Sequence, residues 1–135
     1  EIPHNKGSVA HSDGDVLIHA ICDALLGAAG LRDIGYQFPD TSMDFKNINS
    51  LTLLRRTCSL LKEQGYRVGN MDSTLCLQRP KIKDYVPRMI IMLADALDTD
   101  VANVSVKATT TEKLGFVGEE KGISAYAVVL IYKEA

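Results

Sequence analysis

The chain has 135 residues, of which 46% are hydrophobic and 24% charged, and its formal net charge is −2. This size and balance predict one globular domain with a sizeable core, and they give no electrostatic reason to expect a nucleic-acid or membrane partner. Asp23 interrupts the longest apolar run, so we expect no membrane-spanning helix. The three cysteines lie in apolar patterns without zinc-type pairing, which favours a reducing compartment without disulfides.

The start of the chain is typical of the end of a strand followed by a turn, because Pro3 follows Ile2 directly. A first helix is predicted over about 14–30. The sequence Ser-Asp-Gly-Asp before it fits a capping box, with Ser12 as the N-cap and Asp15 reaching back. Nearly all residues of this helix are apolar or glycine, so we expect it to be buried on all sides.

Helices and strands alternate in the rest of the chain. The predicted elements are a helix over 51–64 capped by Ser50, a strand over 67–78, a helix within 83–100 capped by Asp84, and strands over 104–108 and 123–133. This order predicts an α/β (α+β) sandwich, with a single mixed sheet and helices on one face.

Three polar residues follow one face of the first predicted helix. Asp15, His19 and Asp23 are four residues apart, and we call them the polar stripe. Buried charges need partners. In one interpretation one carboxylate holds the imidazole and the other caps the helix. In the other, the polar stripe belongs to a metal or proton-transfer site whose further ligands come from elsewhere in the chain.

The segment KATTTEKLGF, residues 107–116, directly follows a predicted strand. Residues 109–112 fit a second capping box, so a plain helix start is one interpretation. Three adjacent hydroxyls beside free backbone N–H groups also suit an anion site. Glu112 would repel a phosphate there unless a divalent cation lay between them, as in a diphosphate–magnesium site.

Two further segments have ordinary interpretations when taken alone. The segment 32–40 is an acidic surface turn, and 78–83 is a solvated basic loop. Together with the polar stripe and the hydroxyl-rich segment, they suit a phosphorylated substrate with divalent metals.

The order of these motifs is similar to that of a known family. HSDGDVLIHAICDALLGAAGLRDIGYQFPD, then RPK, then KATTTEKLGF closely resembles the 2-C-methyl-D-erythritol 2,4-cyclodiphosphate synthases of the non-mevalonate isoprenoid pathway, over about residues 2–133. The resemblance implies intramolecular phosphoryl transfer on 4-diphosphocytidyl-2-C-methyl-D-erythritol 2-phosphate, with CMP as the leaving group. It also implies a zinc-type ion, a magnesium- or manganese-type ion, and a homotrimer built around the sheets with active sites between subunits. The compartment it implies is the bacterial cytoplasm, or the plastid stroma in a plastid-bearing organism.

Residue roles follow from the same resemblance. His19 matches a zinc-type ligand, Glu112 the ligand of the second metal, and His11 and Thr110 the residues that stabilise the transition state. Asp15 and Asp23 match no metal ligand, and we interpret them as helix-start and supporting groups. The implied substrate contacts are His11 and Ser12; Asp33, Ile34 and Gly35; Phe38, Pro39, Asp40, Thr41 and Ser42 around the methylerythritol part; Leu77, Gln78, Arg79, Pro80, Lys81, Ile82 and Lys83 around the cytosine; and Thr109, Thr110, Thr111, Glu112 and Phe116.

Two departures from the family pattern stand out. The other two zinc-type ligands of the family come from a D-x-H motif on a first strand. No such motif occurs near Glu1, so we expect 1–135 to be one synthase domain that is incomplete at its N-terminus. Glu119 replaces a common arginine near the expected threefold centre, which puts anion binding there in doubt. Another metal-dependent phosphohydrolase and a non-catalytic nucleotide-binding form remain as alternatives.

Overall fold

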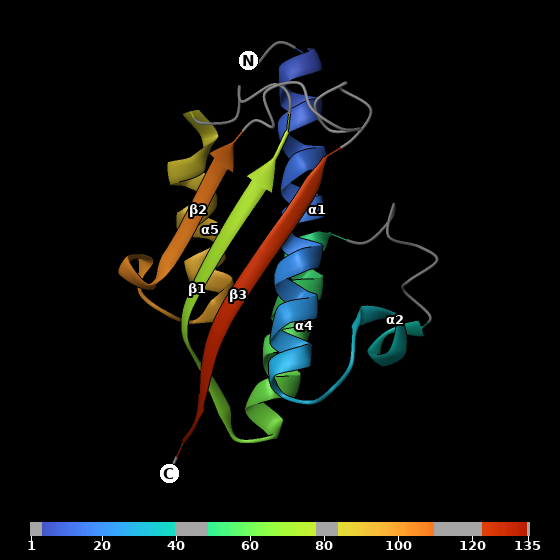
Figure 1. Cartoon of the computed structure of the whole chain (residues 1–135), viewed down its shortest axis with the longest axis vertical. Helices are drawn as coiled ribbons and strands as arrows, with labels where there is room; N and C mark the ends of the chain where they lie inside the picture. The colour runs from blue at the N-terminus through green and yellow to red at the C-terminus, as the bar shows by residue number, and fades with distance from the viewer. Residues whose placement is uncertain (1–3, 40–48, 78–83, 110–122, 135) are drawn as a thin grey trace.

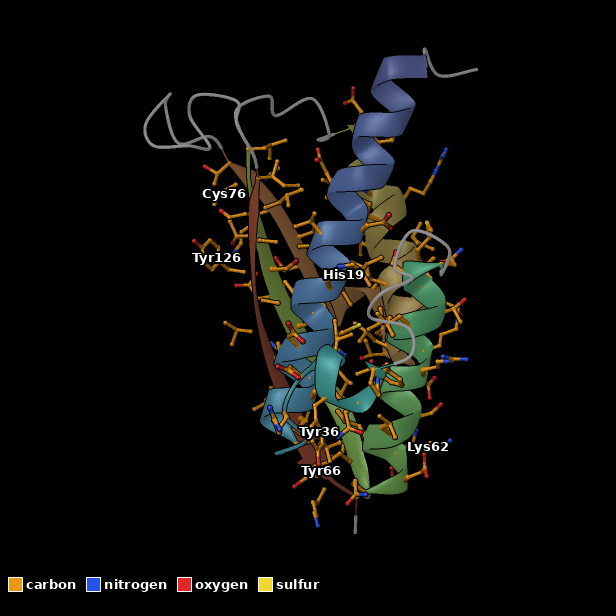
Figure 2. The ribbon with its side chains drawn as sticks, turned by 90° about the vertical axis from the view of Figure 1, so that its right-hand side faces the viewer. His19, Tyr36, Lys62, Tyr66, Cys76 and Tyr126 are labelled. Carbon is orange, nitrogen blue, oxygen red and sulfur yellow. The ribbon has the colours of Figure 1, made fainter. Side chains whose placement is uncertain are left out.

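The computed structural model describes residues 4–39, 49–77, 84–109 and 123–134, with side chains from residue 13 onward. Its elements are the helices α1 (His4–Ala28), α2 (Ile34–Gln37), α4 (Ser50–Glu63) and α5 (Val86–Leu97), the 3-10 helix η2 (Val101–Asn103), and the strands β1 (Tyr66–Cys76), β2 (Val104–Thr109) and β3 (Ser124–Lys133). The predicted α/β sandwich is confirmed, since one mixed sheet has α1, α4 and α5 on a single face (Figures 1 and 2).

The sheet has the strand order β2-β1-β3. The central strand β1 runs parallel to β2, from Met71↔Val104 to Cys76↔Thr109, and antiparallel to β3. The register with β3 shifts at Gly69, where an added Cβ would lie 3.1 Å from the Leu130 carbonyl oxygen. Glycine lets the two backbones approach closely at this irregularity.

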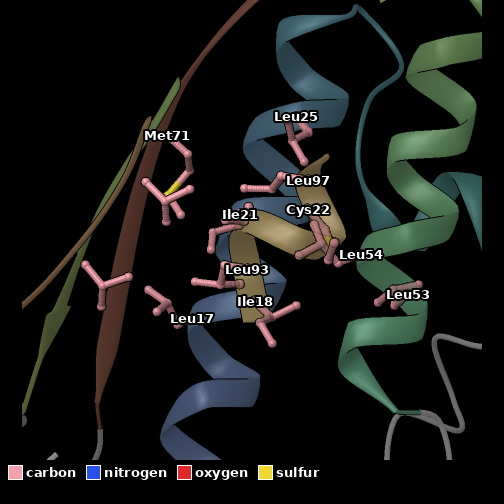
Figure 3. Close-up of a cluster of buried hydrophobic side chains, with 14 of the residues drawn as sticks. Leu17, Ile18, Ile21, Cys22, Leu25, Leu53, Leu54, Met71, Leu93 and Leu97 are labelled. Atoms are coloured by element: carbon pink, nitrogen blue, oxygen red, sulfur yellow. The ribbon is translucent and has the colours of Figure 1, made fainter. Parts of the chain in front are cut away.

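The core lies between the sheet and the helices (Figure 3). Fully buried side chains come from every layer: Leu17, Ile21 and Leu25 of α1, Leu53 and Leu54 of α4, Met71 and Leu75 of β1, and Leu93 of α5 with 2% exposure. Because three helices pack against the same face, the positions of α1 and the sheet are fixed relative to each other.

The helix α1 begins at His4, ten residues before the predicted start. The expected strand end and turn are therefore wrong at residues 4–7, and so is the capping box, because Ser12 lies inside the helix. A capping-box sequence acts as one only where the preceding chain leaves the helix. Pro3 lies just before the first helical residue, and no proline follows it within α1. Gly7 and Gly14 each cost only about 1 kcal/mol relative to alanine.

The other boundaries differ by smaller amounts. Asn49, and not Ser50, caps α4, since its Oδ1 accepts a hydrogen bond from the Leu51 N–H at 2.8 Å. Asp84 is not the cap of α5, which follows Tyr85 without a side-chain cap. Pro87 lies in the first turn of α5, where a missing N–H costs nothing. Among the helices that the structure describes, none is both long and apolar enough to cross a membrane.

Candidate active site

The polar stripe lies on a partly exposed side of α1. Asp15 and His19 are half-buried, while Asp23 is exposed, and His19 lies midway along the helix (Figure 2). The expectation of a helix buried on all sides is therefore wrong on this face. Small residues near the end of the helix, Gly27 and Ala28, are exposed as well. The exposed side of α1 could not be predicted from its apolar composition, because glycine and alanine occur on the surface as well as in the core.

Asp15 connects α1 to the start of α4. The Ser50 hydroxyl donates a hydrogen bond to Asp15 Oδ1 at 2.6 Å, and Ser50 is buried. Ser50 was predicted to be an N-cap, which is a local role, whereas the observed bond joins residues 35 apart in the chain. No local signal distinguishes these two uses of a serine at a helix start, so the sequence analysis missed this contact.

Asp23 connects α1 to the turn at residues 33–35. The Ile34 backbone N–H donates to Asp23 Oδ1 at 3.0 Å. Asp33 caps α2, because its Oδ1 accepts from the Tyr36 N–H, also at 3.0 Å. Two carboxylates thus accept from two backbone N–H groups in the first turn of α2, which are groups that a helix N-terminus leaves without partners.

The predicted substrate turn is held from several sides. Its middle residue, Ile34, is buried, while Asp33 and Gly35 are exposed. The Arg32 guanidinium lies over the Tyr36 ring, 4.3 Å from its centroid. Phe38 packs against the core, and Pro39 is exposed. The turn therefore presents polar groups to solvent from a fixed backbone.

The structure brings the starts of two predicted binding segments together. Leu77 directly follows the last residue of β1, and its N–H donates to the Thr109 carbonyl oxygen at 2.9 Å. Leu77 is buried and Thr109 is exposed. Leu77 and Thr109 directly precede the basic segment 78–83 and the hydroxyl-rich segment 110–112 in the sequence, and they lie side by side at the carboxyl ends of two parallel strands (Figure 1). Ligands of open α/β sheets commonly bind outside this edge.

The remaining predicted site residues lie outside the described part of the structure. They are the side chains of His11 and Ser12, and residues Asp40, Thr41, Ser42, Gln78, Arg79, Pro80, Lys81, Ile82, Lys83, Thr110, Thr111, Glu112, Phe116 and Glu119.

Asp13 carries a buried carboxyl group and directly follows His11 and Ser12 in the sequence. It is 5% exposed, and its Oδ2 has no hydrogen-bond partner among the described side chains. Burial raises its pKa above the usual value of 3.8. Asp13 falls within the predicted capping box, and its sequence position indicates no other role.

Among the residues that the structure describes, His19 is the predicted ligand of a metal. The His19 imidazole is a donor that zinc-type ions accept, and carboxylates one turn away on either side are typical neighbours of such a ligand. Within residues 13–39, 49–77, 84–109 and 123–134, no three histidine, cysteine, aspartate or glutamate side chains are grouped so that they could hold a metal ion. His19 therefore fits one position of a site whose other expected ligand in this chain, Glu112, is not described.

The described site agrees with the family that the sequence resembles: a mixed sheet is backed by helices, and His19 lies between two carboxylates on one of them. The chain belongs to the YgbB family, whose sequence profile matches residues 1–132. Its relatives include proteins named 2-C-methyl-D-erythritol 2,4-cyclodiphosphate synthase. The one from Phocaeicola vulgatus is 62% identical over 130 residues, which are 96% of this chain and 81% of the relative. The one from Bacteroides thetaiotaomicron is 56% identical over 133 residues, 98% of this chain and 84% of the relative.

Solved structures agree with this assignment. The bifunctional IspDF from Campylobacter jejuni superposes with a TM-score of 0.83 at 44% identity, covering 88% of this chain and 32% of that one. A CDP complex of IspF from Plasmodium falciparum superposes with a TM-score of 0.77 at 35% identity, covering 89% of this chain and 72% of that one. The expected family is therefore confirmed over nearly the whole chain.

Proposed function

We propose that this chain converts 4-diphosphocytidyl-2-C-methyl-D-erythritol 2-phosphate into 2-C-methyl-D-erythritol 2,4-cyclodiphosphate and CMP. It is a lyase of isoprenoid precursor biosynthesis. The observation that carries this conclusion is 62% identity, over 96% of the chain, to a relative named for this product. Relatives from bacteria and three free cysteines support a reducing bacterial cytoplasm as its compartment.

The reaction is an intramolecular phosphoryl transfer. An oxygen of the 2-phosphate forms a bond to the β-phosphorus, the bond from that phosphorus to the bridging oxygen breaks, and CMP leaves with that oxygen. Little covalent chemistry falls to the protein, so its tasks are to hold the two phosphates near in-line geometry and to stabilise charge. A zinc-type ion on His19 and a magnesium- or manganese-type ion on Glu112 would polarise the phosphate oxygens when bound.

The remaining residues bind and orient the substrate. Residues 33–35 and 38–42 hold the methylerythritol part, and residues 77–83 surround the cytosine. Thr109–Thr111 bind the phosphates with their hydroxyls, while His11 and Thr110 donate to the oxygens where charge builds up. The hydrogen bond between Leu77 and Thr109 supports this division, because a nucleotide spanning both segments would have its base and its phosphates at neighbouring strand ends.

We also propose a homotrimer with active sites between subunits. Alternation along β3 directs Tyr126, Val128, Leu130 and Tyr132 to the side of the sheet away from the helices, and these side chains are 53–71% exposed. Figure 2 shows Tyr126 on this side. A contiguous apolar stripe of this kind is typical of a protein–protein interface. Closed cyclic assembly is the usual way for identical chains to cover such a face.

Product analysis of the full-length protein tests the activity. The substrate is incubated with zinc and magnesium, and products are separated by chromatography and identified by phosphorus NMR. We expect CMP and the cyclic diphosphate in equal amounts. Release of inorganic phosphate would indicate a phosphohydrolase instead. Binding of CDP without any turnover would indicate a nucleotide-binding module.

A further inference from the structure

The two carboxylates of the polar stripe have a use beyond any direct contact with a metal or a substrate. We propose that Asp23 and Asp15 are positioning residues that fix both ends of the segment 34–50 to the helix that carries His19. Asp23 holds the turn at residues 33–35, and Asp15 holds the first residue of α4. This inference rests on the proposed function, in which that turn binds the methylerythritol part of the substrate.

The geometry places the two anchor points symmetrically about His19. Asp15 lies four residues before His19 and Asp23 four residues after it, so each is about 6 Å away along the helix axis. At one anchor the Ile34 N–H lies 3.0 Å from Asp23 Oδ1, and at the other the Ser50 Oγ lies 2.6 Å from Asp15 Oδ1. The two anchor residues on α1 are thus about 12 Å apart along the helix axis, one turn on either side of His19.

The helix α2 is too short to hold its own conformation, so contacts with the rest of the fold must fix the turn, and the hydrogen bond to Asp23 is one of them. It has four residues, and isolated helices of this length are not stable in water. Asp33 caps the turn from within, but Asp23 is the partner that joins the turn backbone to α1. Losing this bond would therefore change where Asp33 and Gly35 lie relative to His19, even if α2 kept its shape.

Ser50 at the second anchor is buried, which favours a fixed distance there. The preceding residue, Asn49, is the N-cap of α4, and its Oδ1 accepts a hydrogen bond from the Leu51 N–H. The start of α4 is therefore satisfied locally by Asn49, and the bond from Ser50 to Asp15 serves to join two helices. A residue whose only role was helix capping would not need this contact.

Kinetics of Asp23 variants in the full-length, metal-loaded protein test the proposal. Asp23→Ala removes the acceptor, and we expect kcat/KM for the natural substrate to fall by at least about tenfold, because misplacement of a reacting group by a small distance is costly. Asp23→Asn keeps an amide oxygen as acceptor for the Ile34 N–H and should retain kcat/KM within about threefold. Affinity for CDP, which lacks the methylerythritol part, should stay within about twofold of the wild type in both variants.

Asp95→Ala is the matched control. Asp95 is also an exposed carboxylate with a single described partner, Arg55 at 2.8 Å, and it joins α5 to α4 away from the polar stripe. Its removal should leave kcat/KM unchanged. Amide hydrogen exchange at Ile34 gives a readout without activity: protection should fall in Asp23→Ala and persist in Asp23→Asn.

The outcomes separate this inference from the proposed function. Wild-type protein that releases no CMP would refute the function and, with it, the role of the turn. Active wild-type protein with an equally active Asp23→Ala variant would refute only the positioning role. Equal loss in Asp23→Ala and Asp23→Asn would also refute it, because charge and not the hydrogen bond would then matter. A parallel loss of CDP affinity would show general damage to the site and overturn the inference.

Discussion

The apolar stripe on β3 gives the strongest test of the proposed trimer. Leu130 is 64% exposed in the single chain. Full burial of a leucine side chain contributes about 1.5–3 kcal/mol, so covering its exposed part contributes about 1–2 kcal/mol per protomer. Three protomers in one ring gain about 3–6 kcal/mol, or a factor of about 10² to 10⁴ in the association constant. Leu130→Lys removes this gain and adds a charge that repels its copies, while an exposed position leaves the folding of each chain within about 0.5 kcal/mol.

Light scattering after size exclusion at micromolar concentration measures the outcome. We expect the wild type to be a trimer and Leu130→Lys to be mainly monomeric, with a loss of CMP release that parallels the loss of trimer. Ile91→Lys is the control, because Ile91 is 62% exposed but lies on α5, on the helical side of the molecule. A wild-type monomer with full activity, or a Leu130→Lys trimer as stable as the wild type, would refute the reasoning.

Three further outcomes are expected. Glu112→Gln keeps the side-chain size but removes the metal-binding charge, so turnover should fall by at least about tenfold; normal turnover at saturating magnesium would show that Glu112 is only a cap. Burial raises the pKa of the Cys22 and Cys58 thiols to about 12, so they should react with a disulfide reagent at pH 8 far more slowly in the native state than in denaturant. The free energy of unfolding should also decrease as the pH rises above 9, the pKa of these thiols in the unfolded chain. Burial raises the pKa of Asp13, so its ionisation opposes folding at neutral pH. Asp13→Asn should therefore raise the free energy of unfolding in a urea titration at pH 7, and a decrease would show that the carboxylate has a partner.

The last strand was predictable because a long apolar run rich in β-branched and aromatic residues is typical of a strand. The predicted strand over 123–133 matches β3 within one residue, although both of its faces are apolar and the sequence did not indicate which face would be covered. The sheet register was not predictable, because the shift at Gly69 depends on how closely the Leu130 backbone approaches. Periodicity identifies which face of a strand is covered and gives no information about which residue lies opposite.

The helix start and the polar stripe show the same limit at the site. A spacing of four was enough to place Asp15, His19 and Asp23 on one face, and the structure agrees. Their partners were beyond the sequence, because the Ile34 N–H is a backbone group that no side-chain pattern reveals, and Ser50 matched a cap equally well. Capping boxes and tertiary hydrogen bonds use the same residue types, serine and aspartate, so local sequence cannot separate them. The resemblance to a known family supplied the predicted role of His19, whereas the hydrogen bond that joins the turn at residues 33–35 to the helix of His19 is a property of the fold that only the three-dimensional structure reveals.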